Sequence, residues 1–419
     1  MPEMKDSGIE WIGEIPVDWS MKRVKHIFTR KNEKVMQENP TILSLARDGV
    51  KVRDISNNEG QIAESYYNYN PVEKGDLLLN PMDLYSGANC SISKVQGVIS
   101  PAYINLRANA GINPTFYDYY FKVQYWLMVF FSYGKGVSYD NRWTLSAETL
   151  MNYPAVALSY EEQCKRANYL DRKCAQIDAI ISKQQQIIEK LKEYKLSIIT
   201  EAVTKGLDPN VPMKDSGVEW IGKIPEHWNI LKLQAHTRML TPMRDRPEKL
   251  DGDIPWVRIE DYDGKYISTS KEGLGVSLET VNEMNLKIYP VGSILCTSSC
   301  DLGKCAIVTR ELVSNQRFIN IIPDLDTNSD YLYYLMLSNA KRLNHLSTGT
   351  IQANLSRKAF EHLMVQFPPF AEQKEIAEYL DKKCETVELS IRKKQELIDR
   401  LNLYKKSLIY ETVTGKKEI

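Results

Sequence analysis

The sequence MKDSGIEWIGEIPVDW at residues 4–19 returns as MKDSGVEWIGKIPEHW at residues 213–228, with twelve of sixteen positions identical. A second repeated pair reads EEQ…YLDRKC, ending at Cys174, and AEQ…YLDKKC, ending at Cys384. The residues between the repeated segments differ almost completely. These observations indicate a duplicated chain in which variable blocks alternate with repeated segments.

Each second repeat opens a long stretch without glycine or proline, at residues 161–205 and 371–414. Apolar residues recur every seven positions, which predicts two coiled-coil helices of about 45 residues, roughly 65 Å at 1.5 Å per residue. The expected seam positions are Leu170, Ile177, Ile180, Ile187, Leu191, Tyr194 and Ile198, then Leu380, Val387, Leu397, Leu401, Tyr404 and Leu408, with polar Gln184 and Lys394 fixing the register.

Helices this long must project from a globular block and pair, and the obvious partner of each is its own copy. The first helix joins the second block through residues 206–212, and the C-terminus ends where an equivalent linker would begin. The chain therefore resembles a closed ring cut at the linker. We expect antiparallel helices, a globular block at either end and a pseudo-twofold axis.

Both variable blocks have the pattern of mixed, strand-rich folds. Short apolar runs bounded by turn residues predict strands that match in order, at residues 41–45, 75–79 and 102–106 and at residues 254–259, 292–296 and 317–322. Helices are expected at residues 114–131 and 330–343, followed by a proline-containing exit strand in each block. The fold class is α+β, with two similar globular domains and two long helices.

The expected division places the first globular domain at residues 1–155 and the first coiled-coil helix at 156–205. After the linker at 206–212, the second domain spans residues 213–366 and the second helix spans 367–419. The four tryptophans of the opening repeat are expected to be core or staple residues rather than residues that stack on DNA bases: Trp11, Trp19, Trp220 and Trp228.

Composition excludes several classes of protein. The 419 residues contain no apolar run long enough for a membrane span and no basic-then-apolar start typical of a signal peptide. Seven cysteines are too few for a disulfide framework and suggest reduced thiols in the cytoplasm. The 54 basic and 54 acidic residues balance, but a balanced total can hide local patches.

Common catalytic patterns are absent from the sequence. The Gly-Lys pairs lack the rest of a phosphate-binding loop, Asn80-Pro81 is only half of an amino-methyltransferase loop, and Asp324 lacks a nearby nuclease lysine. Cys296, Cys300 and Cys305 do not have the spacing of a zinc knuckle and are better explained as buried thiols. The five histidines stand in no catalytic spacing. The sequence makes no positive case for an enzyme, and no cofactor or metal site is expected.

The duplicated Asp-Ser-Gly-x-Glu-Trp-Ile-Gly-x-Ile-Pro-x-x-Trp opening, the Glu-Gln…Tyr-Leu-Asp helix start and the alternating variable blocks resemble a type I restriction-modification specificity subunit. The resemblance covers essentially the whole chain. It implies that each variable block is a target recognition domain that reads one half of a split DNA sequence. It also implies that the coiled coil separates these domains and docks two methyltransferase subunits, which restriction and translocation subunits then join. S-adenosylmethionine, ATP and Mg²⁺ would belong to those partners.

Local charge agrees with double-stranded DNA as a partner, because residues 20–60 hold nine basic and five acidic residues. Base edges are read mainly by Arg, Asn, Gln and Thr on loops. The segments at residues 135–143 and 348–354 precede the exit strand in their respective blocks. The candidate DNA-binding residues are Arg47, Lys51, Arg53, Lys135, Tyr139, Asn141 and Arg142 in the first block, and Arg244, Arg246, Arg258, Thr350, Gln352 and Asn354 in the second.

Other interpretations remain open. The segment around Gln352 would instead be a turn that caps the next helix, with Asn354 or Ser356 as N-cap. The whole chain would be a coiled-coil scaffold that carries two adapter domains without DNA specificity, or a degenerate methyltransferase-nuclease. Co-purification with two methyltransferase chains would distinguish a specificity subunit from a scaffold. Methyl transfer by the isolated chain would support the degenerate methyltransferase-nuclease.

Overall fold

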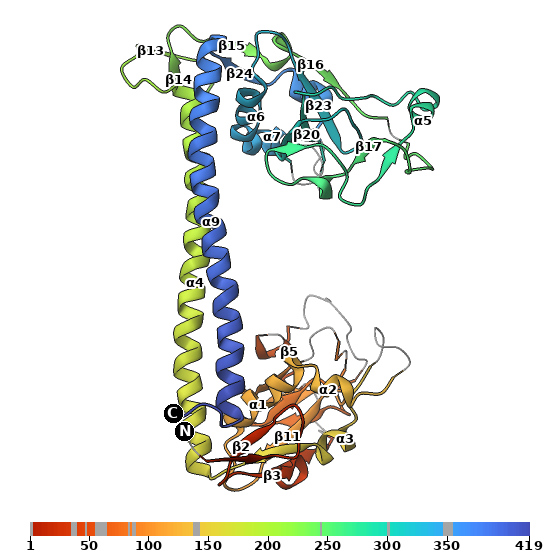
Figure 1. The fold of residues 1–419 in the computed structure, drawn as a ribbon, viewed down its shortest axis with the longest axis vertical. Coiled ribbons are helices and arrows are strands. Elements are labelled where there is room, and N and C mark those ends of the chain that lie inside the picture. Colours follow the sequence, from red (N-terminus) through yellow and green to blue (C-terminus); the bar gives the residue numbers. More distant parts are fainter. Residues whose placement is uncertain are drawn as a thin grey trace. The chain divides into compact units, whose positions relative to one another are not determined.

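A computed structural model describes residues 3–34, 40–46, 48–54, 65–82, 84–85, 89–136, 143–243, 245–299, 302–346 and 355–419. The chain divides into two compact units (Figure 1). Unit 1 comprises residues 1–184 and 396–419, and unit 2 comprises residues 185–395. Each unit therefore contains one variable block and parts of both long helices.

Unit 1 is built around a four-stranded sheet with the order β4-β11-β8-β9. Its strands are β1 (Met4–Asp6), β2 (Glu14–Pro16), β3 (Ser20–Arg23), β4 (Phe28–Lys31), β5 (Leu43–Ala46), β6 (Gly49–Val52), β7 (Asn70–Val72), β8 (Leu77–Leu79), β9 (Cys90–Ile92), β10 (Gly97–Ile99), β11 (Ile104–Ala108) and β12 (Pro154–Ala157). Its short helices are η1 (Val24–His26), α1 (Pro114–Trp126), α2 (Val129–Ser132) and α3 (Ala147–Asn152).

Unit 2 repeats this plan with a five-stranded sheet of order β16-β23-β20-β21-β18. Its strands are β13 (Met213–Asp215), β14 (Lys223–Pro225), β15 (Asn229–Lys232), β16 (Thr237–Leu240), β17 (Ile254–Val257), β18 (Tyr266–Ile267), β19 (Gly275–Val276), β20 (Ile294–Thr297), β21 (Cys305–Val308), β22 (Val313–Ser314), β23 (Phe318–Pro323) and β24 (Met364–Phe367). Its short helices are η2 (Leu233–Ala235), η3 (Ile259–Asp261), α5 (Leu278–Glu283), α6 (Ser329–Ser338), α7 (Ala340–Leu346) and α8 (Arg357–Glu361).

The strand predictions are confirmed, and so is the correspondence between the blocks. All six expected strands are present, as β5, β8 and β11 in unit 1 and as β17, β20 and β23 in unit 2. The sheet order β4-β11-β8-β9 matches β16-β23-β20-β21 strand for strand, and β18 adds an edge that pairs in parallel with β21. The exit strands β12 and β24 pair with β3 and β15. The two blocks therefore share one fold.

Both predicted long helices form. They are α4 (Tyr160–Lys205) and α9 (Phe370–Val413), each drawn as one continuous ribbon in Figure 1. In unit 1, the Arg166 guanidinium near the start of α4 donates to the Thr412 carbonyl near the end of α9, at 2.8 Å. In unit 2, Lys195 late in α4 pairs with Glu388 early in α9. The helices are antiparallel in both units, as expected. No helix in the described ranges is long and apolar enough to span a membrane.

One half of the predicted helix seam is wrong. Leu170, Ile177, Leu380, Val387 and Leu408 are buried as expected. The intercalated positions are instead exposed, by 37–56%, at Ile180, Ile187, Tyr194, Leu397 and Tyr404. The buried intercalated residues lie four positions after a seam residue rather than three, at Cys174, Ile188, Cys384 and Ile398. Because several seam residues are followed by apolar residues at three positions and at four, periodicity alone did not choose between the two faces.

The two helices predicted inside the blocks are each interrupted. The helix expected at residues 114–131 divides into α1 and α2 because Met128 has a left-handed backbone with φ 58°. The helix expected at residues 330–343 divides into α6 and α7 at Asn339, whose side-chain amide donates to the Leu335 carbonyl at 2.9 Å. Left-handed residues and side chains that bond to the backbone end helices locally, without any change in apolar periodicity.

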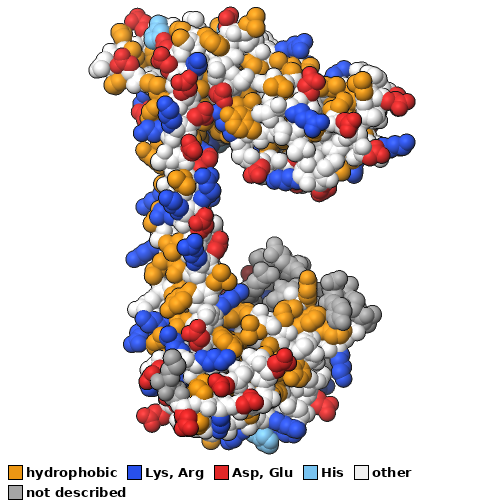
Figure 2. Space-filling model, viewed as in Figure 1, with side chains coloured by type: hydrophobic (Ala, Val, Ile, Leu, Met, Phe, Trp, Pro, Cys, Tyr) orange, Lys and Arg blue, Asp and Glu red, His pale blue; other side chains and the backbone are white. Residues whose placement is uncertain are grey.

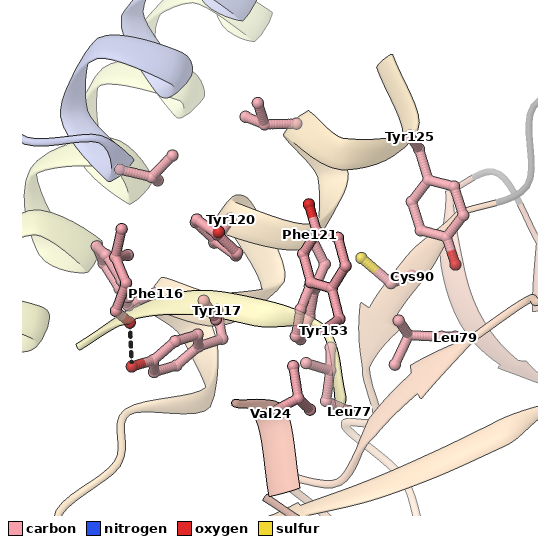
Figure 3. Packing of buried hydrophobic residues seen from close by; sticks show 14 of the residues in the cluster. Val24, Leu77, Leu79, Cys90, Phe116, Tyr117, Tyr120, Phe121, Tyr125 and Tyr153 are labelled. Atoms are coloured by element: carbon pink, nitrogen blue, oxygen red, sulfur yellow. Dashed lines mark hydrogen bonds between the residues drawn. The ribbon is translucent and has the colours of Figure 1, made fainter. Parts of the chain in front are cut away.

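The core of unit 1 packs α1 against the sheet. Figure 3 shows Phe116, Tyr117, Tyr120 and Phe121 of α1 in one buried cluster with strand residues such as Leu77, and all five are fully buried. The Tyr117 hydroxyl donates to the Val156 carbonyl of β12 at 2.9 Å, which satisfies the one polar atom that this ring takes into the core.

Three of the four repeated tryptophans are in or against the core, but Trp220 is not. Trp19 and Trp228 are buried, and Trp11 packs against the core of unit 1 with its ring 6.0 Å from that of Tyr120. Trp220 is 45% exposed, and the Arg342 guanidinium lies 4.0 Å from its ring centroid. Trp220 is therefore not a core residue, and an arginine rather than a tyrosine faces its ring.

Candidate nucleic-acid interface

Most of the DNA-binding residues proposed from sequence fall where the structure makes no statement. Eight of them lie outside the described residues: Arg47, Tyr139, Asn141, Arg142, Arg244, Thr350, Gln352 and Asn354. The remaining five are described: Lys51, Arg53, Lys135, Arg246 and Arg258.

In unit 1, the structure places Lys51 and Arg53 at and just after β6, which pairs with β5. Lys51 forms an ion pair with Asp48 in the same hairpin. The backbone amide of Arg53 donates to the Ile42 carbonyl at 2.8 Å, so it extends the hairpin by one bond. Lys135 is exposed, and it exchanges two backbone hydrogen bonds with Thr144. These bonds close the base of the segment that was proposed as a reader.

In unit 2, Arg246 and Arg258 both lie near β17, as the sequence suggested. The Arg246 guanidinium is 5.7 Å from the ring centroid of Trp256. Arg258 forms a 2.7 Å ion pair with Glu272, and this hydrogen bond raises the pKa of the guanidinium. The side chain of Arg258 is thus already held by a carboxylate, and a phosphate would have to share or replace that partner.

The ends of the proposed reading segments occupy equivalent places in the two units. In unit 1, the amide of Leu145 donates to the Pro81 carbonyl, just beyond the end of β8, at 2.9 Å. In unit 2, the amide of Leu355 donates to the Ser298 carbonyl, just beyond β20, at 2.8 Å. The residue that follows, Ser146 or Ser356, is the N-cap of the next short helix. The capping alternative is therefore confirmed for Ser356, while Asn354 lies outside the described residues.

Further loop ends gather around the same point of each sheet. In unit 1, the Asn89 side chain before β9 donates to the Ala46 carbonyl at the end of β5, at 2.7 Å. The amide of Asn80 donates to the Asn89 carbonyl at 2.8 Å. In unit 2, the amide of Ser298 donates to the Arg317 carbonyl at 2.8 Å, which brings the turn before β23 to the end of β20. Several loops thus meet at one end of the strands in each sheet.

In unit 2 the loops at these strand ends surround a cavity of about 580 Å³, which we call the polar groove. Its lining residues that carry side-chain donors or acceptors are Thr241, Ser298, Ser299, Gln316 and Arg357. A second cavity of about 550 Å³, the basic groove, also contains Arg357. Its other polar lining residues are Lys232, Gln234, Thr237, Arg238 and Glu361.

The two grooves therefore adjoin at Arg357, whose Nε donates to the Glu361 carboxylate at 2.6 Å. Hydroxyl and amide side chains line the groove on one side of this arginine, and the groove on the other side adds the cations Lys232 and Arg238. Amide and hydroxyl groups read base edges, whereas lysine and arginine neutralise phosphates. This arrangement has the chemistry needed to hold a nucleic acid by its backbone and to inspect its bases.

Sequence reasoning did not identify the groove residues. Ser298 and Ser299 follow a buried strand, and Gln316 precedes one, so a signal was present in the chain: polar residues at the ends of apolar runs. Neighbouring strands determine which ends meet, and strand order is not visible in a single sequence. The preference for arginines also drew attention away from residues 298–299 and 316.

The described residues show no sign of a metal centre or a disulfide framework. Within these ranges, no group of three or more His, Cys, Asp or Glu side chains is placed to hold a metal ion. Cys296 and Cys305 face each other across β20 and β21 as free, buried thiols, and burial raises the pKa of Cys296. Cys300, the third residue of that cluster, lies outside the described residues.

Comparison with known proteins gives consistent matches. A family model described as the Type I restriction modification DNA specificity domain matches residues 236–398, which include most residues of both grooves. The specificity subunit of the type I restriction enzyme MjaIX from Methanocaldococcus jannaschii is 32% identical over 189 residues, which is 44% of each protein. The MjaVIII specificity subunit from the same organism is 23% identical over 432 residues, covering 96% of this chain and 93% of the relative.

Two solved structures share the fold at 12% sequence identity. One, from work on complex assembly and conformational transition of the type I restriction-modification system, has a TM-score of 0.73 and covers 96% of this chain and 99% of that one. The other, the HsdS subunit from Thermoanaerobacter tengcongensis, has a TM-score of 0.51 and covers 96% and 98%.

Proposed function

Since this chain belongs to the specificity subunits of type I restriction-modification systems, we propose that it recognises a split, asymmetric DNA sequence, one half with each globular domain. The observation that carries the proposal is that the ends of equivalent strands carry different side chains in the two domains. Asn80 and Pro81 stand at the end of β8, where Ser298 and Ser299 stand at the end of β20. Equivalent positions with different donors and acceptors fit two different half-sites.

The polar and basic grooves support a division of labour within the second domain. Lys232 and Arg238 would contact phosphates, which anchor the protein without selecting a sequence. Gln316 and Ser298 would face base edges, where a glutamine pairs best with adenine. Arg357 lies between the two sets and is positioned to contact either.

The length of the helices supports a role in fixing the gap between the half-sites. The 46 residues of α4 correspond to about 69 Å at 1.5 Å per residue. The base pairs between the two half-sites would contact neither domain. Their number would therefore matter, but their sequence would not. Readers that approach one face of DNA suit half-site centres one helical turn apart, roughly 10 bp, or a multiple of that distance.

Exposed apolar residues on the long helices support docking of two methyltransferase subunits. Ile187 and Tyr194 on α4 are 37% and 56% exposed, and their repeat counterparts Leu397 and Tyr404 on α9 are 41% and 55% exposed. On the face shown in Figure 2, hydrophobic side chains interrupt the charged ones along these helices. Two matching surfaces fit two copies of one partner. The restriction subunits would join that core.

We assign no catalytic step to this chain. S-adenosylmethionine, ATP and Mg²⁺ would be bound by the partner subunits, and the assembly would act in the cytoplasm on double-stranded DNA. The comparisons give no support to the alternative of a scaffold without DNA specificity.

The test is to reconstitute the chain with its methyltransferase partner and sequence the methylated positions in a library of DNA targets. We expect one split motif with a fixed gap. Gln316→Ala should relax the motif in one half only, with a loss of discrimination of about 5- to 150-fold, which corresponds to ~1–3 kcal/mol.

Lys232→Ala is the matched control from the adjoining groove. It should weaken binding to all sequences alike and lower the salt dependence by about one released counterion, without altering the motif. A continuous motif, or a Gln316→Ala motif identical to that of the unmodified chain, would contradict the assignment.

A further inference from the structure

Each globular domain is tied to a long helix by the same buried amide. In unit 1, the Gln163 side-chain oxygen on α4 accepts from the backbone amide of Asn113 at 2.8 Å. In unit 2, Gln373 on α9 accepts from the amide of Asn328, also at 2.8 Å. Both glutamines are almost fully buried. Asn113 and Asn328 are the N-caps of α1 and α6, so the bond fixes the start of the helix that covers each sheet.

A second repeated bond lies further along the same helices. The Tyr119 hydroxyl of α1 donates to the Asp171 carboxylate of α4 at 2.8 Å. The Tyr334 hydroxyl of α6 donates to the Asp381 carboxylate of α9 at 2.6 Å. Each tyrosine comes six residues after its asparagine in the sequence. Apolar residues of the long helices also belong to the core of each domain, so the core and these bonds together set the direction of α1 or α6 against the long helix.

Unit 2 has a further attachment, which comes from its sheet. The Lys265 ammonium forms ion pairs with Asp381 on α9 and with Asp330 on α6, the latter at 2.6 Å. It also lies 5.0 Å from the ring centroid of Tyr334. Its side chain is only 15% exposed, and the two carboxylates raise its pKa against the opposing effect of burial. A lysine held in this way stays charged and paired.

Lys265 comes from the sheet, not from the helix layer. It immediately precedes β18, and the Ile307 amide of β21 donates to its carbonyl at 2.8 Å. β21 pairs directly with β20, and β20 ends at the polar groove beside Ser298. A continuous hydrogen-bonded path therefore connects Asp381 on the long helix to the groove.

The described residues of unit 1 show no equivalent bridge from sheet to helix. The position that corresponds to Asp330 is Thr115, which has no carboxylate. The nearest comparable lysine, Lys122, pairs at 2.6 Å with Asp118 on its own helix, α1. The bridge through Lys265 thus distinguishes the second domain from the first.

We propose that Lys265 is a positioning residue that locks the second reading domain at one angle on α9 and thereby narrows the range of gap lengths accepted between the half-sites. The inference rests on the proposed function, because a gap matters only to a protein that reads two half-sites. A polar contact from the sheet adds to the apolar core that the domain shares with the long helices, and it resists small rotations of the sheet against α9. Such a rotation would move the groove along the DNA. The first domain shares a core with the long helices but shows no such sheet contact among its described residues, so it would tolerate more variation.

The test compares Lys265→Met with Lys122→Met in the reconstituted methyltransferase complex. Methylation rates are measured on DNA targets that share both half-sites and differ by one base pair more or less in the gap. Lys265→Met should raise the rate on the altered gaps about tenfold relative to the normal gap, with the half-site motifs unchanged. Lys122→Met should leave this ratio unchanged, and Lys265→Arg should restore it.

A loss of thermal stability in Lys265→Met with the same gap preference would show a purely structural role and overturn the inference. Equal relaxation by Lys122→Met would do the same. If the unmodified complex reads no split motif, the proposed function itself fails. A second measurement is independent of methylation: the distance distribution between spin labels at Leu278 and Leu389, both exposed in unit 2, should broaden in Lys265→Met. An unchanged width would overturn the inference.

Discussion

Ile177 and Ile180 provide a direct test of the helix seam. They are identical residues three positions apart on α4, yet Ile177 is 6% exposed and Ile180 is 44% exposed. Replacement by alanine removes three carbon atoms in each case. At ~0.8 kcal/mol for each buried carbon group, full burial corresponds to about 2.4 kcal/mol. We therefore expect Ile177→Ala and Ile180→Ala to differ clearly in their effect on unfolding.

The expected losses follow from exposure and from the space left behind. Ile177→Ala should lower the free energy of unfolding by about 3 kcal/mol, because a cavity adds to the transfer cost. Ile180→Ala retains the solvent contact of the exposed part and gains a few tenths of a kcal/mol from the better helix propensity of alanine. Its loss should be about 1 kcal/mol or less.

Hydrogen exchange followed by mass spectrometry suits a chain with two units, whose global unfolding need not be two-state. Peptides from residues 170–184 and 398–413 report on the helix pairing in unit 1. The 2 kcal/mol difference corresponds to about 30-fold faster exchange in Ile177→Ala than in Ile180→Ala. If the two variants accelerate hydrogen exchange equally, the helix seam described above is wrong. Ile180 would then belong to the interface between α4 and α9.

Two further predictions concern the helix surface and a buried acid. Ile187→Glu combined with Leu397→Glu should reduce binding of the methyltransferase subunits at least about tenfold in a titrated pull-down, while the free energy of unfolding stays within about 0.5 kcal/mol; unchanged binding would remove these positions from the docking surface. Burial raises the pKa of Asp118 above its ordinary value of 3.8 despite the Lys122 ammonium nearby. The folded state therefore binds the proton of Asp118 more tightly than the unfolded state does. The free energy of unfolding should fall as the pH rises from the ordinary pKa of 3.8 through the higher pKa of the folded state. Asp118→Asn should remove this part of the pH dependence in urea unfolding curves, and an identical dependence would contradict the assignment.

The features that repeat along the chain were predictable from sequence. The long helices, their antiparallel pairing and the six matched strands all follow from periodicity and duplication, which are local or internal to the sequence. Even the side of the helix that would face a partner was partly visible, because Leu170 and Leu380 mark the buried series in both copies.

The features that depend on neighbours were not predictable. Trp220 is exposed although its repeat counterpart Trp11 packs against the core, because the residues that face the two rings come from the variable blocks. The polar groove brings Thr241, Ser298 and Gln316 together from three loops that are far apart in the chain. Strand order decides such meetings, and it is fixed by packing that a single sequence does not display.

The C-terminal end of each candidate reading segment is joined to the framework by a backbone hydrogen bond. Leu145 to Pro81 and Leu355 to Ser298 join through amide and carbonyl groups, which every non-proline residue offers at the donor end. Side-chain substitutions within the segments therefore leave these two backbone bonds available. Mutation within these segments would therefore change the DNA preference during evolution while the fold of each domain stays the same.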